Sequence, residues 1–420
     1  MSGRRAVHEA GLPDRHNMLS GHDIVCFALR AWDSPWKNNQ QIMSVLARSN
    51  RVLYVGPPRS FRESVQALRT RTRNRPTVDR LAERLFVYRE PWFLSRFRPT
   101  RRGGSVLNQM TQMVRIAHVR RICHRLGFQL PILWVYDPML ASVVGTFREK
   151  LVVYHVIDPY DEYFASDATR SRSLVAGNQR IMLERADVVF AVSEALHRRC
   201  LESNQNSHLV PNGVNYPLFE SAMRGDRLPD DVVGIPRPIV GYVGVIRPGV
   251  DFHLLGQMAD RRPDWSFMFV GPPEYLNGRE GFSALVERHN VYYLGAKPVE
   301  QIPYYVKACD VGILPYKNDG TSLYGDSLKL YEYLACGRPV VSSDMPFSRR
   351  FAPLVRIGRD LPEFIDGIER SLAEDGAGKV ERMALAEQHS WDRRVDLISE
   401  LIGATLGHAG HKDLVERSAR

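Results

Sequence analysis

Short runs of apolar and β-branched residues alternate with longer stretches of helical period from residue 22 to about residue 403. This alternation is typical of βαβ units, in which a helix returns the chain so that the next strand lies parallel to the previous one. The sequence therefore predicts an α/β protein built on parallel sheets. Strands are expected at residues 22–29, 51–56, 85–90, 131–136, 150–157, 187–193, 207–212, 239–246, 265–271, 290–295, 310–316, 338–343 and 354–358. Helices are expected at 38–49, 104–126, 172–185, 194–202, 360–375 and 379–403.

The stretch 226–238, DRLPDDVVGIPRP, interrupts this pattern and predicts a linker, because it is rich in proline and acidic residues. A chain of 420 residues suits two domains. Ligands of open parallel sheets bind beyond the carboxyl ends of the strands, so we expect the site where the two domains face each other. The predicted parts are a tail (1–20), a first domain (21–225), the linker (226–238), a second domain (239–380), a C-terminal helix that crosses back to the first domain (381–403) and a tail (404–420).

The formal net charge of +10 is concentrated in the segment Arg59–Arg102, where 13 arginines face four acidic residues. Nucleic acid, anionic lipid headgroups and phosphorylated substrates all attract such a segment, and a solvated basic face without a partner is a further alternative. Its aromatic residues suit insertion at a membrane interface as well as base stacking. We expect an anionic membrane surface as the partner and do not expect nucleic acid.

The five cysteines lie far apart and form no CxxC pair, which argues against a zinc site and against a disulfide framework. No apolar run approaches the ~20 residues of a membrane span, and the first residues lack an apolar signal core. We therefore expect a cytoplasmic protein, bound at most peripherally to the inner face of the cell membrane.

The segment 325–341, GDSLKLYEYLACGRPVV, predicts a helix that begins near Asp326 or Ser327 and ends at Gly337. Apolar residues cover nearly every face of this helix, so the carboxylate of Glu332 needs polar partners, and two vicinal ribose hydroxyls would satisfy it. Lys329 lies one turn earlier, and the free N–H groups at the helix start add positive potential, which together suit a diphosphate. An ordinary ion pair on a partly exposed helix is the alternative.

KLYEYLACGRPVV and the preceding DVGILPY resemble the donor-site helix of GT-B glycosyltransferases, especially the large retaining family 4. GYVGVI, WSFMFVGPP, NVYYLGAKPVEQIPYYVKACDVGILPY, VPNGVN and SWDRR follow the order and spacing of such enzymes over about residues 186–400. The first half, with FALRAWDSPWKNNQQIMSVLARSNRVLYVGPP and KLVVYHVIDPYDEY, resembles the bacterial subgroup that includes the teichuronic acid transferases, and more distantly the xanthan glucuronosyltransferase.

This resemblance implies the GT-B fold, two Rossmann-like domains that face each other across a cleft. It also implies transfer of a hexosyl or glycuronosyl group from a nucleotide-sugar to a saccharide or lipid-linked acceptor, in the synthesis of bacterial cell-surface polysaccharide or glycolipid. The donor-binding residues that it implies are Gly244, Arg247, Gly271, Lys329 and Glu332.

The chain departs from the family pattern at the acid that usually stands eight residues before the ribose-binding Glu, because Tyr324 occupies that position. Family 4 enzymes retain and the xanthan-type relatives invert, so the stereochemical outcome stays open, as do the sugar and the base. The D-x-D triad with which GT-A transferases hold a metal is absent from the sequence. Lys329 and Arg247 would then meet the charge of the leaving diphosphate, and we expect neither a metal nor a cofactor.

Activation of the acceptor is expected from the first domain. Asp158 follows a strand and matches the acid of the xanthan-type subgroup, and a carboxylate there takes the proton of an acceptor hydroxyl. His155 is the rival base, although its mid-strand position equally suits a core residue. Asp33 and Trp36 follow the first strand and are candidates for acceptor binding, with interdomain packing as the alternative role for the tryptophan.

Two other functions remain open at this stage. A nucleotide-sugar epimerase also uses two such halves, and a non-catalytic module would use the basic segment to hold nucleic acid or an anionic membrane. A dehydrogenase is disfavoured, because no G-x-G-x-x-G follows a strand.

Overall fold

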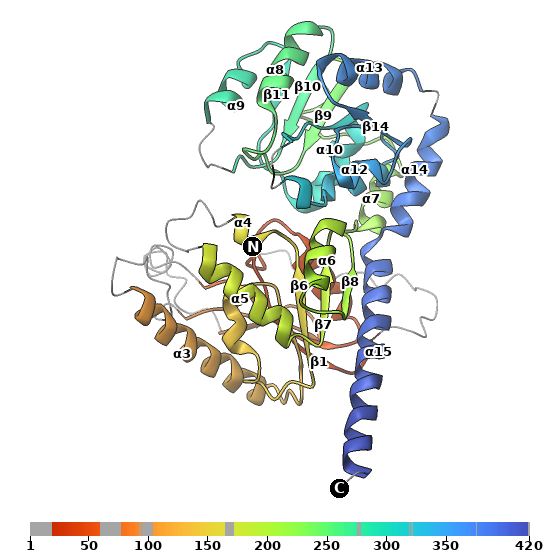
Figure 1. Cartoon of the computed structure of the whole chain (residues 1–420). Helices are drawn as coiled ribbons and strands as arrows, with labels where there is room; N and C mark the ends of the chain where they lie inside the picture. The colour runs from red at the N-terminus through yellow and green to blue at the C-terminus, as the bar shows by residue number, and fades with distance from the viewer. Residues whose placement is uncertain are drawn as a thin grey trace.

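The structure is a computed structural model that describes residues 19–58, 77–91, 94, 104–163, 172–274, 279–318, 320, 322–374 and 376–418. The chain forms two Rossmann-like domains, one above the other in Figure 1, and a long C-terminal helix that runs down the side of the lower one. Each domain is a parallel sheet with helices on its faces, the α/β architecture that the alternating pattern predicts.

The sheet of the first domain has the strand order β3-β4-β2-β1-β5-β6-β7-β8. Its strands are parallel except for the antiparallel pair β3 and β4. They are β1 (Asp23–Phe27), β2 (Arg51–Val55), β3 (Val78–Arg80), β4 (Leu85–Tyr88), β5 (Ile132–Val135), β6 (Leu151–Val156), β7 (Val188–Ala191) and β8 (Ser207–Leu209). The helices are α1 (Asn38–Leu46), α3 (Gly104–Arg125), η3 (Pro138–Val143), α4 (Tyr160–Tyr163), α5 (Arg172–Arg185) and α6 (Glu194–Leu201).

The sheet of the second domain is parallel throughout and has the order β11-β10-β9-β12-β13-β14. Its strands are β9 (Ile239–Val243), β10 (Ser266–Val270), β11 (Val291–Tyr293), β12 (Val311–Leu314), β13 (Val340–Ser343) and β14 (Val355–Gly358). The helices of this half are α7 (Tyr216–Met223), α8 (Phe252–Arg261), α9 (Arg279–Val286), η5 (Val299–Gln301), α10 (Ile302–Ala308), η6 (Ser322–Tyr324), α11 (Leu328–Ala335), α12 (Pro346–Arg349), α13 (Leu361–Leu372), α14 (Ala377–Gln388) and α15 (Trp391–Ser418).

Local sequence explains where several helices begin. Asp251 caps α8 by accepting the N–H of Leu254 at 3.0 Å, and Asp360 caps α13 in the same way through the N–H of Glu363 at 2.9 Å. The central strands β1, β5, β9 and β10 are buried along their whole length, which explains their continuous apolar runs.

The chain crosses between the domains twice, near Val214 and near Ser390, and the two crossing segments are hydrogen-bonded to each other. Val214 donates its N–H to His389 O at 3.1 Å, and Trp391 donates to Val214 O at 2.9 Å. A Cβ on Gly213 would lie 2.6 Å from His389 O, so glycine is required for this approach. Beyond this point α15 packs along the first domain, where Val395, Ile398 and Ile402 share a core with residues of α1.

Three predictions about this framework need correction. The stretch 226–238 is no free linker, because Val232 and Ile235 are buried in the second domain with α7, so that domain begins near Val214. The expected helix 379–403 is two helices, broken where the crossings pair, and α15 continues through most of the expected tail. The region 57–84, in which no strand was expected, contains β3.

The basic segment Arg59–Arg102 lies mostly outside the described residues, so its predicted role stays a prediction. All five cysteines are buried as free thiols. Within the described part of the chain, no helix is long and apolar enough to cross a membrane.

Candidate functional site

Charged side chains from both domains meet where the carboxyl ends of the two sheets approach each other. Arg30 follows β1 and lies 3.9 Å from Glu274, which follows β10 in the other domain. Burial raises the pKa of Asp158, while Arg247, Lys37 and Arg30 act in the opposite direction. Groups influence each other in this way only at short range, so we call Arg30, Lys37, Asp158, Arg247 and Glu274, together with Lys329 and Glu332, the interdomain site.

Lys37, at the residue before α1, is surrounded by other cations of this group. Its pKa is lowered to about 7, chiefly by burial and also by the neighbouring cations Arg247, Arg30 and Lys329, while Asp158 acts in the opposite direction. Because like charges repel, the crowding of cations is unfavourable in the absence of an anion. The interdomain site is therefore suited to bind a strongly negative ligand.

The side chain of Lys329 packs directly against the backbone of Gly244. A Cβ on Gly244 would lie 2.3 Å from Lys329 Cε, and Gly244 has a φ of +135°. Gly271 has a φ of +136°, and a Cβ there would lie 2.2 Å from Gly244 O. The ammonium of Lys329 donates to Tyr316 Oη at 3.4 Å and lies 5.0 Å from the ring centroid of Tyr242. Gly244 thus gives Lys329 room at the end of β9, and Gly271 allows the end of β10 to approach the backbone of Gly244.

Glu332 lies one turn after Lys329 on α11, half-buried among apolar neighbours. Burial raises its pKa to about 7, and Lys329 partly opposes this shift. Among the described residues, none forms a hydrogen bond to its carboxylate. The carboxylate is therefore available for hydroxyl donors of a ligand.

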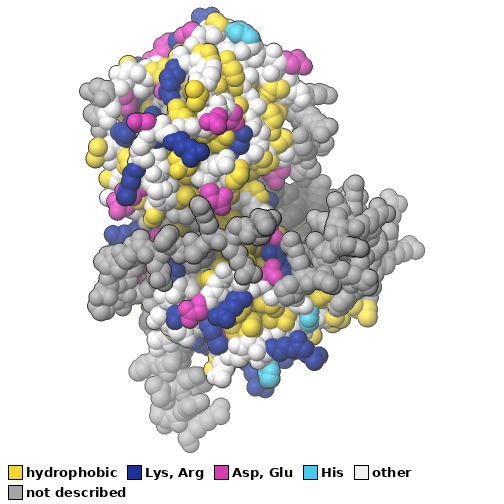
Figure 2. Space-filling model, turned by 180° about the vertical axis from the view of Figure 1, so that it is seen from behind, with side chains coloured by type: hydrophobic (Ala, Val, Ile, Leu, Met, Phe, Trp, Pro, Cys, Tyr) yellow, Lys and Arg dark blue, Asp and Glu magenta, His cyan; other side chains and the backbone are white. Residues whose placement is uncertain are grey.

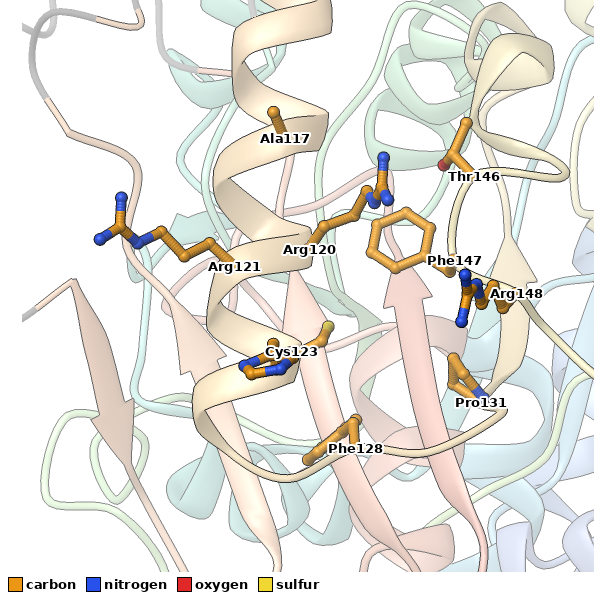
Figure 3. A pocket seen from close by; sticks show the side chains of 10 residues that line it. Ala117, Arg120, Arg121, Cys123, Phe128, Pro131, Thr146, Phe147 and Arg148 are labelled. Atoms are coloured by element: carbon orange, nitrogen blue, oxygen red, sulfur yellow. The ribbon is translucent and has the colours of Figure 1, made fainter.

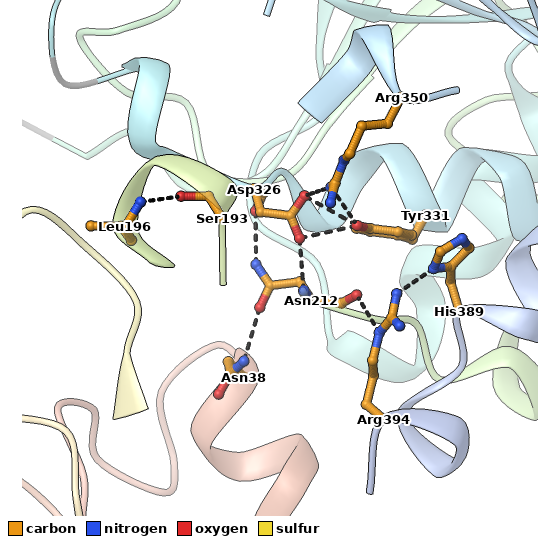
Figure 4. Close-up of polar contacts among 9 residues, drawn as sticks. All are labelled: Asn38, Ser193, Leu196, Asn212, Asp326, Tyr331, Arg350, His389 and Arg394. Carbon is orange, nitrogen blue, oxygen red and sulfur yellow. Dashed lines mark hydrogen bonds and ion pairs between the residues drawn. The ribbon is translucent and has the colours of Figure 1, made fainter. Parts of the chain in front are cut away.

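The start of α11 is fixed to the first domain through Asp326, whose side chain is fully buried (Figure 4). Its carboxylate accepts the N–H of Asn212 at 2.7 Å, the hydroxyl of Tyr331 at 3.0 Å and the guanidinium of Arg350 at 2.6 Å. The amide of Asn38 in turn donates to Asn212 Oδ1 at 2.9 Å. Asp326 therefore positions the helix that carries Lys329 and Glu332.

The two candidate bases of the first domain differ sharply in their surroundings. Asp158 follows β6 at its carboxyl end and belongs to the interdomain site. His155 is fully buried, its ring stacked on Tyr136 with centroids 5.0 Å apart, and burial lowers its pKa to about 3. Neither ring nitrogen has a described hydrogen-bond partner. A neutral imidazole in such a core is no acceptor-side base, so His155 is withdrawn as a candidate.

Asp33 and Trp36 are engaged in structural contacts. Arg89 donates to both carboxylate oxygens of Asp33, at 2.5 and 3.2 Å, and also pairs with Asp79. Trp36 packs edge-on against Trp32, with centroids 5.1 Å apart. The packing alternative therefore explains Trp36, within the first domain rather than between domains.

Sequence reasoning missed Lys37, Arg30 and Glu274. Each lies in a loop after a strand or before a helix, where charged residues are common and solvated. Only the approach of the opposing domain brings them into the interdomain site. Tyr324, which replaces the expected acid, packs against the guanidinium of Arg199, 5.4 Å from its ring centroid. The described residues contain no group of three or more His, Cys, Asp or Glu side chains placed to hold a metal ion.

Residues 237–374 match the model of the family described as Glycosyl transferases group 1. TuaH of Bacillus subtilis (strain 168), which carries the name of a teichuronic acid biosynthesis glycosyltransferase, is 29% identical over 279 residues, 62% of this chain and 68% of that relative. These findings support a glycosyltransferase and support neither the epimerase nor the non-catalytic module.

The chain also resembles solved structures of sugar-transferring enzymes. HepE of Anabaena, in complex with UDP and glucose or with UDP-glucose, gives TM-scores of 0.63 and 0.64 at 15% and 14% identity, over 91% of this chain and 100% of that chain. A structure titled trehalose-6-phosphate from E. coli, bound with UDP-2-fluoro glucose, gives 0.63 at 13% identity, over 90% and 98% of the two chains. At these identities the likeness shows the fold, which is GT-B with two Rossmann-like domains.

The raised pKa of Glu332 predicts a pH dependence of stability. The unfolded carboxyl titrates near 4.5 and the folded one near 7, so the folded state binds the proton more tightly. This contribution to stability is fully present below pH 4.5 and is lost as the pH rises through 7, by up to about 3 kcal/mol. Urea unfolding at pH 4.5, 5.5, 6.5 and 7.5 should show this loss in the wild type and not in Glu332→Gln.

The exposed Glu381 supplies a control, since Glu381→Gln should follow the wild type at every pH. Parallel stability curves for the wild type and Glu332→Gln would contradict the raised pKa of Glu332.

Proposed function

We propose that this chain, a glycosyltransferase with the GT-B fold, transfers a hexosyl or glycuronosyl group from a UDP-sugar to a saccharide or lipid-linked acceptor in the synthesis of bacterial cell-surface polysaccharide or glycolipid. The observation that carries the proposal is the pairing, on one buried helix, of a carboxylate with no described partner and an ammonium seated against glycine. The name of TuaH supports the acceptor class, and the UDP complexes of HepE support the donor.

Glu332 and Lys329 bind different parts of the donor. The carboxylate of Glu332 accepts hydrogen bonds from the two ribose hydroxyls, which replace the hydration lost by burial. Lys329 and Arg247 bind the diphosphate, and their charge also stabilises the UDP that leaves. Gly244 at the end of β9 leaves the space in which Lys329 reaches this position.

In the transfer step the acceptor oxygen forms a bond to the anomeric carbon, and the bond from that carbon to the diphosphate breaks with its electron pair on the phosphate oxygen. Asp158 takes the proton of the acceptor hydroxyl. Burial, which raises the pKa of Asp158, makes the carboxylate a better base, while the surrounding cations act on its pKa in the opposite direction.

We also propose that the reaction runs without a divalent metal. Arg30, Lys37, Arg247 and Lys329 bring four cationic side chains to the interdomain site. A diphosphate relieves the repulsion among these cations, which is the electrostatic role that a metal ion plays in other transferases. Donor binding that is unchanged by EDTA would agree with this proposal, and its loss would contradict it.

The first prediction for the donor site concerns UDP affinity. Lys329→Gln and Glu332→Ala should each weaken UDP binding by about tenfold or more, because each removes a charge-assisted contact of about 1.5–3 kcal/mol. Calorimetric titration with UDP measures the change, and the unfolding temperature reports whether the fold persists.

Lys379→Gln is the matched control, because Lys379 is an exposed lysine of α14 in the same domain. Unchanged UDP affinity in both donor-site variants would remove this helix from the donor site.

The second prediction separates chemistry from binding. Asp158→Asn should keep the UDP affinity and lower turnover by about 10²–10⁴, the usual range for loss of a general base. Turnover is measured as UDP release from the best-binding UDP-sugar, with a bacterial lipid extract as the acceptor source. Asp230→Asn, at an exposed position, is the control, and wild-type turnover in Asp158→Asn would transfer the role of base to the donor phosphate.

We further propose that the enzyme acts in the cytoplasm, bound peripherally to the anionic inner face of the membrane. Helix α3 exposes Met110, Met113 and Val114, with exposed fractions of 58%, 68% and 53%. Figure 2 shows hydrophobic side chains beside Lys, Arg and His side chains on the lower domain. Such a surface suits insertion among lipid headgroups, and the segment Arg59–Arg102 would add electrostatic attraction.

Vesicle flotation tests the attachment. The wild type should float with phosphatidylglycerol vesicles more than with phosphatidylcholine vesicles and less at high salt, and Met110→Gln with Met113→Gln should lower the floated fraction several-fold. Val233→Gln with Val380→Gln is the control, since these residues are equally exposed elsewhere. Absence of flotation with either vesicle would contradict the proposal.

A further inference from the structure

A pocket of about 460 Å³ lies in the first domain at the edge opposite the interdomain site. Its walls are the C-terminal half of α3 and the two turns that precede β5 and β6. The strands of this sheet begin at this edge, whereas Asp158 and Arg30 follow the ends of β6 and β1. The pocket is therefore separate from the donor and acceptor groups.

Three arginines, His124 and two phenylalanines give the pocket its chemistry. Figure 3 shows the guanidinium groups of Arg120 and Arg148 on either side of the Phe147 ring, while Arg121 leaves the other side of α3. Phe128 and Pro131 lie below them and form an apolar part of the lining. The lining thus combines cationic donors, of which Arg120 and Arg148 flank Phe147, with an apolar surface.

The positive charge of the pocket is not neutralised within the described part of the chain. No described Asp or Glu lines the pocket, and no described carboxylate forms an ion pair with Arg120 or Arg148. The carboxylate of the neighbouring Glu149 instead accepts the N–H groups of Gly145 and Phe147. Two guanidinium groups without a carboxylate partner attract an anion.

Hydrogen bonds hold both walls in place. Arg51 pairs with Asp23 at 2.7 Å and donates to the carbonyl oxygens of Leu126 and Gly127 in the turn before β5. Arg185 donates to Val144 O at 3.1 Å in the turn before β6. The pocket is therefore formed before any ligand binds, which lowers the entropic cost of binding.

The backbone is strained at the same place. Leu130 and Arg148 have φ angles of 41° and 51°, and no other non-glycine residue in the described part of the chain has a positive φ. Leu130 precedes the lining residue Pro131, and Arg148 is itself a lining residue. Strain of this kind persists where the surroundings impose it, and it occurs preferentially at binding sites.

We propose that this pocket binds a phosphoryl group that is attached to an apolar or aromatic moiety. Arg120 and Arg148 donate hydrogen bonds to the phosphoryl oxygens, and the carbon part lies against Phe128, Phe147 and Pro131. Two sources share this chemistry, a soluble phosphorylated compound and the headgroup of a membrane phospholipid. The lipid source rests on the proposed membrane attachment, whereas the soluble source does not.

Phenyl phosphate is the probe, because it combines both chemical features, and benzyl alcohol is its neutral counterpart. Calorimetric titration with saturating UDP present keeps the interdomain site occupied. The wild type should bind phenyl phosphate saturably and should not bind benzyl alcohol. Arg120→Gln with Arg148→Asn should weaken phenyl phosphate binding at least tenfold, and asparagine is chosen because it tolerates the positive φ of position 148.

Arg227→Gln with Arg261→Gln removes the same charge at exposed positions in the second half of the chain and should bind as the wild type does. Arg148→Gly relieves the strain and should also lose affinity, which separates loss of the guanidinium from misfolding.

Displacement of phenyl phosphate by phosphatidylglycerol vesicles assigns the lipid source, and persistence of binding assigns the soluble source. Absence of saturable binding in the wild type, or equal binding in the Arg120 and Arg148 double variant, would overturn the proposal. UDP affinity is measured separately, so failure here is distinguishable from failure of the proposed transferase function.

Discussion

The relative placement of the two domains depends on the buried carboxylate of Asp326. A buried charge is unfavourable unless hydrogen-bonded partners surround it, and here the partners come from both domains: Asn212 from the first, and Tyr331 and Arg350 from the second. Separation of the domains would leave the carboxylate without one of them. Because Asp326 lies two residues before α11, the same contacts fix the start of the helix that carries Lys329 and Glu332.

This placement concentrates charge in a way that neither domain shows alone. Lys37 comes from the first domain and Arg247 and Lys329 from the second, and their mutual repulsion adds to the effect of burial in lowering the pKa of Lys37. Glu332 is half-buried, and burial raises its pKa. Natural sequences tolerate such local conflicts at functional sites, where a ligand resolves them. The unfavourable electrostatics of the free protein thus indicate the chemistry of the ligand, which carries negative charge and hydroxyl donors.

The sequence predicted the elements that periodicity determines and missed the features that depend on tertiary contact. Parallel strands and the apolar helix around Glu332 are visible as patterns, and resemblance supplied the GT-B fold. The stretch 226–238 has linker composition, yet Val232 and Ile235 pack into the second domain. The sequence around His155 does not distinguish a catalytic base from a core residue. Its stacking on Tyr136 in the structure identifies it as a core residue. Lys37 could not be identified from the sequence, because most of its charged neighbours, Asp158, Arg247 and Lys329, come from distant parts of the chain.

The two proposed binding sites differ in how the fold contributes to them. Open parallel sheets place ligand groups at the carboxyl ends of their strands, so the interdomain site follows from the architecture. The amino ends offer no such general site, and the pocket beside Phe147 depends on individual side chains and on two strained residues. Stability of the sheet does not require an arginine at position 148, since glycine would adopt the same φ with less strain. The guanidinium at that position is therefore better explained by what the pocket binds than by how the domain folds.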